Sequence, residues 1–214
     1  MAQDSKSIKA RFVENEIIVD GILDDKVWST AMEGGDFMQF FPTDSLLANY
    51  PTNFKIVYSS TTLYVALKAF TQTNKPVVSS LKRDFKALTN DSVTLLFDTF
   101  SDGTTGFFFG VTPYGVRREG LVSDGGQVFN NTWDNKWIAE TQQYDDHFTA
   151  EIAIPFSSLK FVEGATQWRF RPYRWNVQSN EQSSWVRVPQ NQRLSSFAFM
   201  GTLIFEKPLG KSKA

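Results

Sequence analysis

Apolar and polar residues alternate along several short segments of the chain, and this spacing predicts β-strands rather than helices. Between residues 53 and 70, two alternating runs flank a polar turn at 59–62, so we expect a β-hairpin there. A second pair of strands is expected over 91–97 and 106–112, and a third hairpin over 137–154, with its turn at 144–146 and Pro155 ending the strand. The other strands predicted from the same alternation cover residues 168–177 and 200–206.

The helical signal is weak by comparison. Asp24 is placed to cap a short turn over residues 25–31, and residues 157–159 are expected to form one helical turn. Many short strands separated by Gly, Pro, Asn and Asp favour an all-β fold, an antiparallel two-sheet β-sandwich. We expect one sandwich domain over 11–206, a disordered N-terminal segment over 1–10 and a frayed tail over 207–214.

Composition narrows the classes of function. The 214 residues are 15% aromatic, which suits a β-rich core, and the formal net charge is −1. A balanced charge lacks the basic surface that nucleic-acid binding requires, so no nucleic-acid partner is expected. Cysteine is absent, which excludes disulfides and thiolate metal sites and is compatible with a bacterial protein that acts outside the cytoplasm.

Catalytic groups are scarce in this sequence. His147 is the single histidine, so a Ser-His-Asp triad is excluded, and we expect His147 at the surface of a hairpin. A glycosidase needs two carboxylates at a set separation, and nothing in the sequence pairs any two of the candidates. These candidates are Asp84, Asp91, Glu119, Asp134, Glu151 and Glu181. We therefore predict that the protein is not an enzyme.

Metal binding stays open at this stage. Asp91, Asp98 and Asp102 lie around one predicted hairpin, and carboxylate oxygens on turns are ligands that calcium accepts. Their spacing differs from that of an EF-hand loop. The sequence is compatible with a structural calcium ion, but it assigns no metal-ligating residue, and no other cofactor is expected.

Aromatic and arginine side chains offer the strongest binding signal. The segment 169–185 has the sequence RFRPYRWNVQSNEQSSW, and on a strand Arg169, Arg171 and Trp175 share one face. A guanidinium beside an indole suits a neutral polyol or an anionic sugar. The alternative is a solvated strand whose arginine stems pack on a neighbouring element.

Trp133 and Trp137 lie four positions apart in the segment TWDNKW. Trp137 begins a predicted strand, so we expect its ring in the core. Trp133 lies in a polar loop, where an exposed ring suggests a ligand contact, and only this tryptophan of the pair is a candidate site residue.

Residues 19–28, VDGILDDKVW, resemble the DGxLDExxW opening of family 9 carbohydrate-binding modules. The chain resembles more closely the N-terminal domain of the DUF5916 outer-membrane proteins, through the blocks EIAIPFSSLKF at 151–161, DSVTLLFDTFSD at 91–102 and FGVTPYG at 109–115. The resemblance implies a jelly-roll β-sandwich. Classical modules of this family hold a sugar between two tryptophans and carry structural calcium, so the resemblance implies that this chain could do the same. A C-terminal outer-membrane barrel follows the domain in the DUF5916 relatives, and we expect this chain to be a separate domain without it.

The resemblance also sorts the candidate residues. Trp28 belongs to the fold motif and is expected in the core, while Arg83, Asp84, Trp133, Arg174 and Glu181 are expected in loops or at strand ends, where binding sites gather. With Arg171, Trp175 and Trp185, these five form the predicted ligand-binding set. Arg169 stands where the relatives have glycine, so the local backbone differs from the family pattern there.

The sequence therefore predicts a non-catalytic, extracytoplasmic module that binds a saccharide or polysaccharide. The alternative is a protein-interaction or plug-like periplasmic domain whose partner is an outer-membrane barrel or a secretion system. A third hypothesis comes from distant folds that bind haem between strands, for which His147, Lys or Met would supply the axial ligand.

Overall fold

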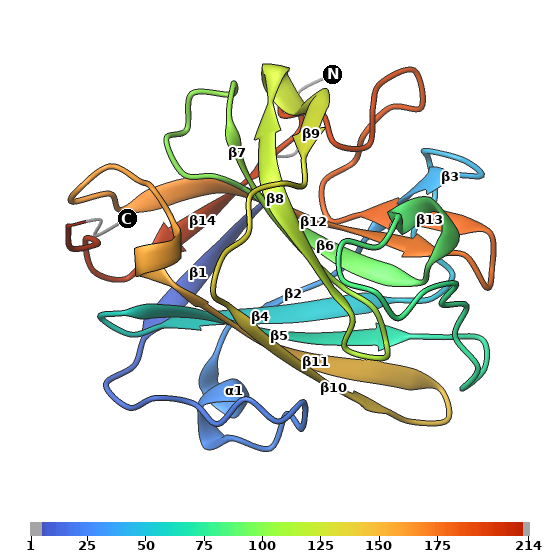
Figure 1. Ribbon diagram of the computed structural model, residues 1–214, viewed down its shortest axis with the longest axis horizontal. Helices are drawn as coiled ribbons and strands as arrows, with labels where there is room; N and C mark the ends of the chain where they lie inside the picture. Colours follow the sequence, from blue (N-terminus) through green and yellow to red (C-terminus); the bar gives the residue numbers. More distant parts are fainter. Residues whose placement is uncertain (1–5, 212–214) are drawn as a thin grey trace.

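The computed structural model describes residues 6–211, and β-strands account for most of its regular structure (Figure 1). The strands are β1 Ser7–Phe12, β2 Glu33–Gly34, β3 Met38–Phe41, β4 Thr52–Tyr58, β5 Thr62–Phe70, β6 Ser92–Asp98, β7 Gly106–Val111, β8 Arg117–Ser123, β9 Val128–Asn130, β10 Ile138–Gln143, β11 His147–Pro155, β12 Gln167–Asn176, β13 Glu181–Ser184 and β14 Gly201–Phe205. The helical elements are α1 Lys26–Thr30 and the 3₁₀ turns Ala87–Thr89, Asp124–Gly126 and Phe156–Ser158. No helix within residues 6–211 is long and apolar enough to cross a membrane.

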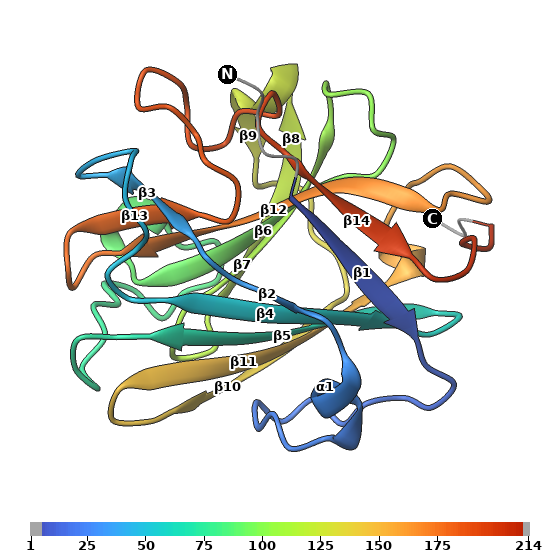
Figure 2. The same ribbon diagram turned by 180° about the vertical axis from the view of Figure 1, so that it is seen from behind.

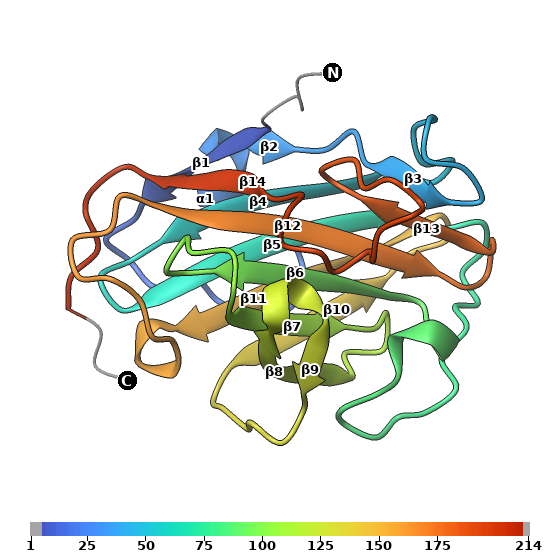
Figure 3. The ribbon, with the colours of Figure 1, turned by 90° about the horizontal axis from the view of Figure 1, so that it is seen from above.

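The strands form one curled sheet, in the order β10-β11-β5-β4-β1-β14-β12-β6-β7-β8-β9. Figure 3 shows β14, β12, β6, β7 and β8 following one another along one side of the molecule. The predicted all-β class is confirmed, but the two halves are not separate sheets. The reason is β1, which pairs in parallel with β14 through its first residues and with β4 through Arg11 and Phe12.

This joining strand corrects the expectation that residues 1–10 are disordered. Residues 7–10 pair with β14, and the side chains of Ile8 and Ala10 are fully buried. Residues 1–5 of that predicted segment lie outside the described residues. The expected frayed tail also differs, because Leu209 packs into the core and its backbone bonds Gly164 and Ala165. Residues 212–214 of the tail lie outside the described range.

The predicted hairpins are present in the structure. Antiparallel pairs join β4 to β5, β6 to β7 and β10 to β11, as the alternation indicated. The strands β12 and β14 also lie where they were predicted. The strands β1, β2, β3, β8, β9 and β13 were not predicted. The alternation in β1 is short, and the other five lack a clear apolar alternation.

The helical expectations hold only in part. The short helix α1 is present, but its N-cap is Asp25 rather than Asp24, and no side chain makes a capping hydrogen bond. The chain turns once after Pro155, in the 3₁₀ turn Phe156–Ser158.

Two apolar clusters lie on opposite faces of the β12–β8 half of the sheet. The main core fills the space between the two halves of the curled sheet and includes Trp137, as predicted. The second cluster, with Phe108, Tyr173 and Leu194, lies on the outer face, beneath the segment 185–200. Trp28 is buried as expected, on the outer side of β4, β5 and β11, where α1 lies (Figure 2).

Candidate functional site

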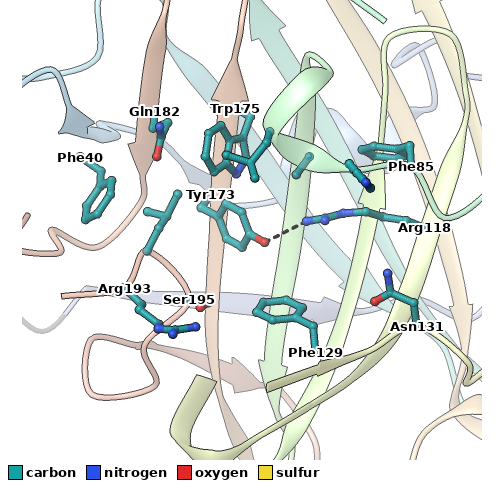
Figure 4. A pocket seen from close by; sticks show the side chains of 14 residues that line it. Phe40, Phe85, Arg118, Phe129, Asn131, Tyr173, Trp175, Gln182, Arg193 and Ser195 are labelled. Carbon is teal, nitrogen blue, oxygen red and sulfur yellow. Dashed lines mark hydrogen bonds between the residues drawn. The ribbon is translucent and has the colours of Figure 1, made fainter. Parts of the chain in front are cut away.

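A hollow of about 550 Å³ opens on the outer face of the β12–β8 half of the sheet (Figure 4). Its floor comes from β12 and β8, and its walls come from β3, β9, β13, the segment 85–88 and the segment 193–195. The residues that line it are Phe40, Phe85, Lys86, Ala87, Leu88, Arg118, Phe129, Asn131, Tyr173, Trp175, Gln182, Arg193, Leu194 and Ser195.

The hollow exists because one row of residues across the sheet is large at its ends and small in its middle. Tyr173 pairs with Thr94, Thr94 with Gly110, and Gly110 with Arg118, so the four lie side by side on neighbouring strands. A Cβ on Gly110 would lie 2.8 Å from the Nε of Arg118. The glycine therefore provides the room in which the arginine lies flat over the sheet.

Aromatic rings surround this floor. Trp175 is half-buried, Phe129 projects from the edge strand β9, and Phe40 is partly exposed on β3. Phe129 also packs against Phe108 of the outer cluster, with ring centroids 5.1 Å apart. Rings with one open face are the surfaces on which the apolar C–H face of a sugar stacks.

Arg118 is the one charged side chain that is buried in the floor, and it is 7% exposed. Its Nη2 donates to Thr94 Oγ1 at 2.8 Å and to the Tyr173 hydroxyl at 2.9 Å. The guanidinium also lies over the rings of Phe85 and Phe108, at 5.4 Å and 5.3 Å from their centroids. Neutral hydroxyls and ring faces hold Arg118 in place, but they do not neutralise its charge.

Two further arginines fix the wall that faces Trp175. Arg171 donates to the carbonyls of Leu194 and Phe199, and Arg169 donates to the carbonyl of Phe197 and to Asp98. Burial lowers the pKa of Arg171 to about 9. Segment 194–199 is therefore tied to the outer face of β12 by side-chain donors, whereas a ladder of backbone bonds fixes the strands.

Of the predicted ligand-binding residues, Trp175 lines the hollow and Arg171 supports its wall. Three others are buried and have partners inside the protein. Arg174 donates to the backbone carbonyls of Tyr50 and Phe70. Glu181 accepts hydrogen bonds from the Gln39 side chain and the Asn49 backbone N–H. Trp185 packs in the core, with its ring 5.2 Å from that of Phe54.

Of these three residues, Glu181 lies at a strand end as expected, whereas Arg174 does not. Arg174 lies within β12 on the face turned toward the main core, where burial lowers its pKa to about 10. Glu181 begins β13, but its carboxylate is buried. The charge of Arg174 and Glu181 suggested an exposed site, but both side chains are buried and form hydrogen bonds between neighbouring elements.

Arg83, Asp84 and Trp133 lie together, but outside the hollow. Arg83 pairs with the buried Glu119 and lies 3.8 Å from Asp134. Burial raises the pKa of Asp84, the charge of Arg83 opposes that rise, and the charge of Asp134 adds to it. Trp133 is partly buried, and its ring contacts Phe107 and Phe109, so it closes the edge of the core and is not an exposed platform.

Two of the acidic residues considered for calcium, Asp91 and Asp98, accept hydrogen bonds from backbone N–H groups. Both oxygens of Asp98 accept backbone N–H groups, from Asp102 and Gly103, and Asp91 accepts them from Val77 and Gln178. Across residues 6–211, no group of three or more His, Asp or Glu residues is placed to hold a metal ion. His147 stacks on Tyr144 and bonds Asp146 in the hairpin turn.

Sequence reasoning missed most of the lining. Phe85, Lys86, Arg118, Phe129, Asn131, Gln182 and Arg193 were not among the predicted site residues. One signal was available, because Gly110 interrupts an aromatic strand and marks a close approach from a neighbouring chain segment. The other missed residues come from loops and from the short strands β9 and β13, whose contacts no local pattern predicts.

No protein-family model and no curated protein sequence matches the chain. Solved structures do match its fold. A Bacteroides uniformis protein, to which carbohydrate binding is provisionally ascribed, superposes with a TM-score of 0.77 at 11% identity, over 95% of this chain and 100% of that one. A family 9 carbohydrate-binding module from Caldicellulosiruptor kristjanssonii in complex with cellotriose gives 0.66 at 15% identity, over 97% and 95% of the two chains.

The same kind of module from Caldicellulosiruptor kristjanssonii in complex with glucose gives a TM-score of 0.65 at 15% identity, over 98% of both chains. At these identities the likeness concerns the fold. The chain therefore has the fold of the family 9 carbohydrate-binding modules, as the motif at 19–28 predicted.

Proposed function

We propose that this protein is a non-catalytic carbohydrate-binding module and that it holds a saccharide in the hollow between Trp175, Phe129 and Arg118. The observation that supports this most directly is the composition of the hollow, which combines partly open aromatic rings with amide and guanidinium donors. Rings stack on the C–H faces of a sugar, while Gln182, Asn131 and the arginines are suited to bond its hydroxyls.

The fold neighbours support the same class of ligand. Two of them are modules in complex with cellotriose and with glucose, and their chains align with this one over nearly its whole length. The fold alone does not determine a ligand, since one fold hosts many functions. The proposal therefore depends on the side chains of the hollow.

A glycan array followed by calorimetric titration tests this function. We expect saturable binding to at least one glycan, and we expect Trp175→Ala to weaken it. An array without any binding, from protein that melts cooperatively, would contradict the proposal. The array should include neutral and acidic glycans, because the hollow contains both rings and cations.

The alternative function is docking to another protein at the bacterial envelope. It is supported by the exposed apolar side chains of Phe41, Leu46 and Leu47, on β3 and the loop that follows it. Under this proposal the module acts outside the cytoplasm beside an outer-membrane barrel, as in the DUF5916 proteins that its motifs resemble. Cell fractionation and crosslinking of the envelope test it, and recovery of the protein in the cytoplasm alone would contradict it.

A further inference from the structure

The charges that line the hollow are all positive. Lys86, Arg118 and Arg193 are its charged residues, and no Asp or Glu is among the residues that line it. The chain as a whole has 22 basic and 23 acidic residues, so the excess of positive charge is local. A site for a neutral sugar would need no such excess of positive charge, because amides and hydroxyls alone can form hydrogen bonds with sugar hydroxyls.

None of these three cations is neutralised within the protein. Among residues 6–211, the ion pairs that form involve other basic residues. Arg193 donates to the carbonyl of Gln127, which is uncharged, and the side chain of Lys86 is exposed. Their positive charge is therefore available to a ligand.

Arg118 makes the strongest case because it is buried. Its Nε is enclosed and has no hydrogen-bond partner among the described residues. Transferring an unpaired cation out of water is costly, and an opposite charge placed beside it recovers part of that cost. The folded protein keeps this unpaired cation in the floor of an aromatic hollow, where a bound anion would offset the cost of its burial.

From this geometry we infer that the hollow binds an acidic saccharide, a sugar that bears a carboxylate or sulfate group. Trp175 and Phe129 stack on the ring, and Arg118, Lys86 and Arg193 attract the acidic group. A planar carboxylate matches the fork of a guanidinium, and a charge-assisted hydrogen bond is stronger than a neutral one. The inference rests on the proposed function and adds the chemical class of the sugar.

Three glycosides that differ only at C6 provide the test. Methyl β-glucuronide, methyl β-glucoside 6-sulfate and methyl β-glucoside are titrated against the full chain at low and high salt. We expect an acidic glycoside to bind about tenfold or more tightly than the neutral one at low salt, with a smaller ratio at high salt. The two acidic arms decide between carboxylate and sulfate.

Substitutions identify the residues that cause the preference for acidic glycosides. Arg118→Met is expected to abolish the preference for the acidic glycosides. Because Arg118 is buried, its replacement could also disturb folding, so the exposed residues are changed separately, in Lys86→Gln and Arg193→Gln. Each is expected to reduce the ratio severalfold. Lys26→Gln, on α1 at the other side of the molecule, is the matched loss of one exposed charge and should leave the ratio unchanged.

The possible results distinguish the preference for acidic sugars from saccharide binding itself. Equal or tighter binding of the neutral glycoside would overturn the acidic class and leave carbohydrate binding standing. An unchanged ratio in the Lys86, Arg118 and Arg193 variants would also overturn it. If neither these glycosides nor any glycan on the array binds, the proposed function fails, and this inference fails with it.

Discussion

The indole of Trp28 donates a hydrogen bond of 2.7 Å to the carboxylate of Glu151, across 123 residues of sequence. The second oxygen of that carboxylate accepts the backbone N–H groups of Asp20 and Gly21. One buried side chain thus joins the block at 19–28 to the block at 151–161. These are the blocks on which the sequence resemblance was based, and their shared role is structural.

Replacing Glu151 with glutamine should lower the free energy of unfolding by about 2–3 kcal/mol. Glutamine keeps one acceptor oxygen, but its NH₂ group would face N–H donors that the carboxylate now satisfies. Denaturant unfolding followed by tryptophan fluorescence measures the change. Glu140, which is exposed and lies opposite Glu151 in the β10–β11 ladder, provides the control. Glu140→Gln should change stability by less than about 0.5 kcal/mol, and an equal loss in both variants would contradict this role.

Trp175 and Trp133 should respond differently to truncation. Trp175→Ala is expected to weaken saccharide binding about tenfold or more, because its half-buried ring lines the hollow, and to change stability little. Trp133→Ala removes ring contacts with Phe107 and Phe109 and should cost about 2 kcal/mol of stability while affinity is kept. Calorimetry and thermal melts on both proteins distinguish the two effects. The reverse result would make Trp133 the ligand-binding ring.

Asp84 should make the protein less stable as the pH rises. Burial raises the pKa of its carboxyl, so the folded state favours the protonated form. The stabilising contribution is complete below the usual pKa and is lost as the pH rises through the folded value. Asp84→Asn removes this dependence. The difference in stability between Asp84→Asn and the wild type should therefore favour the variant more at pH 7 than at pH 3, and thermal melts of both proteins at the two pH values measure it.

The backbone supplies the control for this pH effect. Asp84 has a φ of 62°, a left-handed conformation that asparagine tolerates and alanine does not. Asp84→Ala should therefore be about 1 kcal/mol less stable than Asp84→Asn at every pH. If asparagine and alanine behave alike, the backbone conformation assigned to this position is wrong.

Most of the strands that were predicted from the sequence belong to hairpins, in which the partner strand follows closely along the chain. The hairpins β4–β5 and β10–β11 need only local alternation and a polar turn. The strand β1 has no such partner. It pairs with β14, almost two hundred residues away, and its alternation is too short to distinguish it from a loose terminus. Local sequence patterns therefore could not predict that β1 joins the two halves into one sheet.

The candidate site was harder to predict for a related reason. Arginine and tryptophan at 169–185 suggested a ligand, but the same residue types also join elements, as Arg174 and Trp185 do. Only burial separates the two uses, and burial depends on contacts between segments far apart in the sequence, such as those of Arg174 with Tyr50 and Phe70. The row from Tyr173 to Arg118 crosses four strands, so no linear motif contains it.

Arg171 should act on the hollow through its wall rather than through the ligand. In Arg171→Met the carbonyls of Leu194 and Phe199 lose their donors, while the cost of burying an unneutralised cation also disappears. These effects oppose each other, so we expect a net stability loss of only about 1–2 kcal/mol, but faster hydrogen exchange at residues 193–199. Saccharide affinity should fall severalfold as Leu194 and Ser195 lose their position.

Arg187→Met provides the matched change in the same chain segment. Arg187 is exposed and pairs with Asp44, and an exposed pair contributes little to stability. Exchange at residues 193–199 should be unchanged in that variant, and Arg171→Lys should restore part of the protection, because a lysine can donate to at least one of the two carbonyls. Equal exchange at 193–199 in Arg171→Met and the wild type would show that the wall is held by its apolar packing instead.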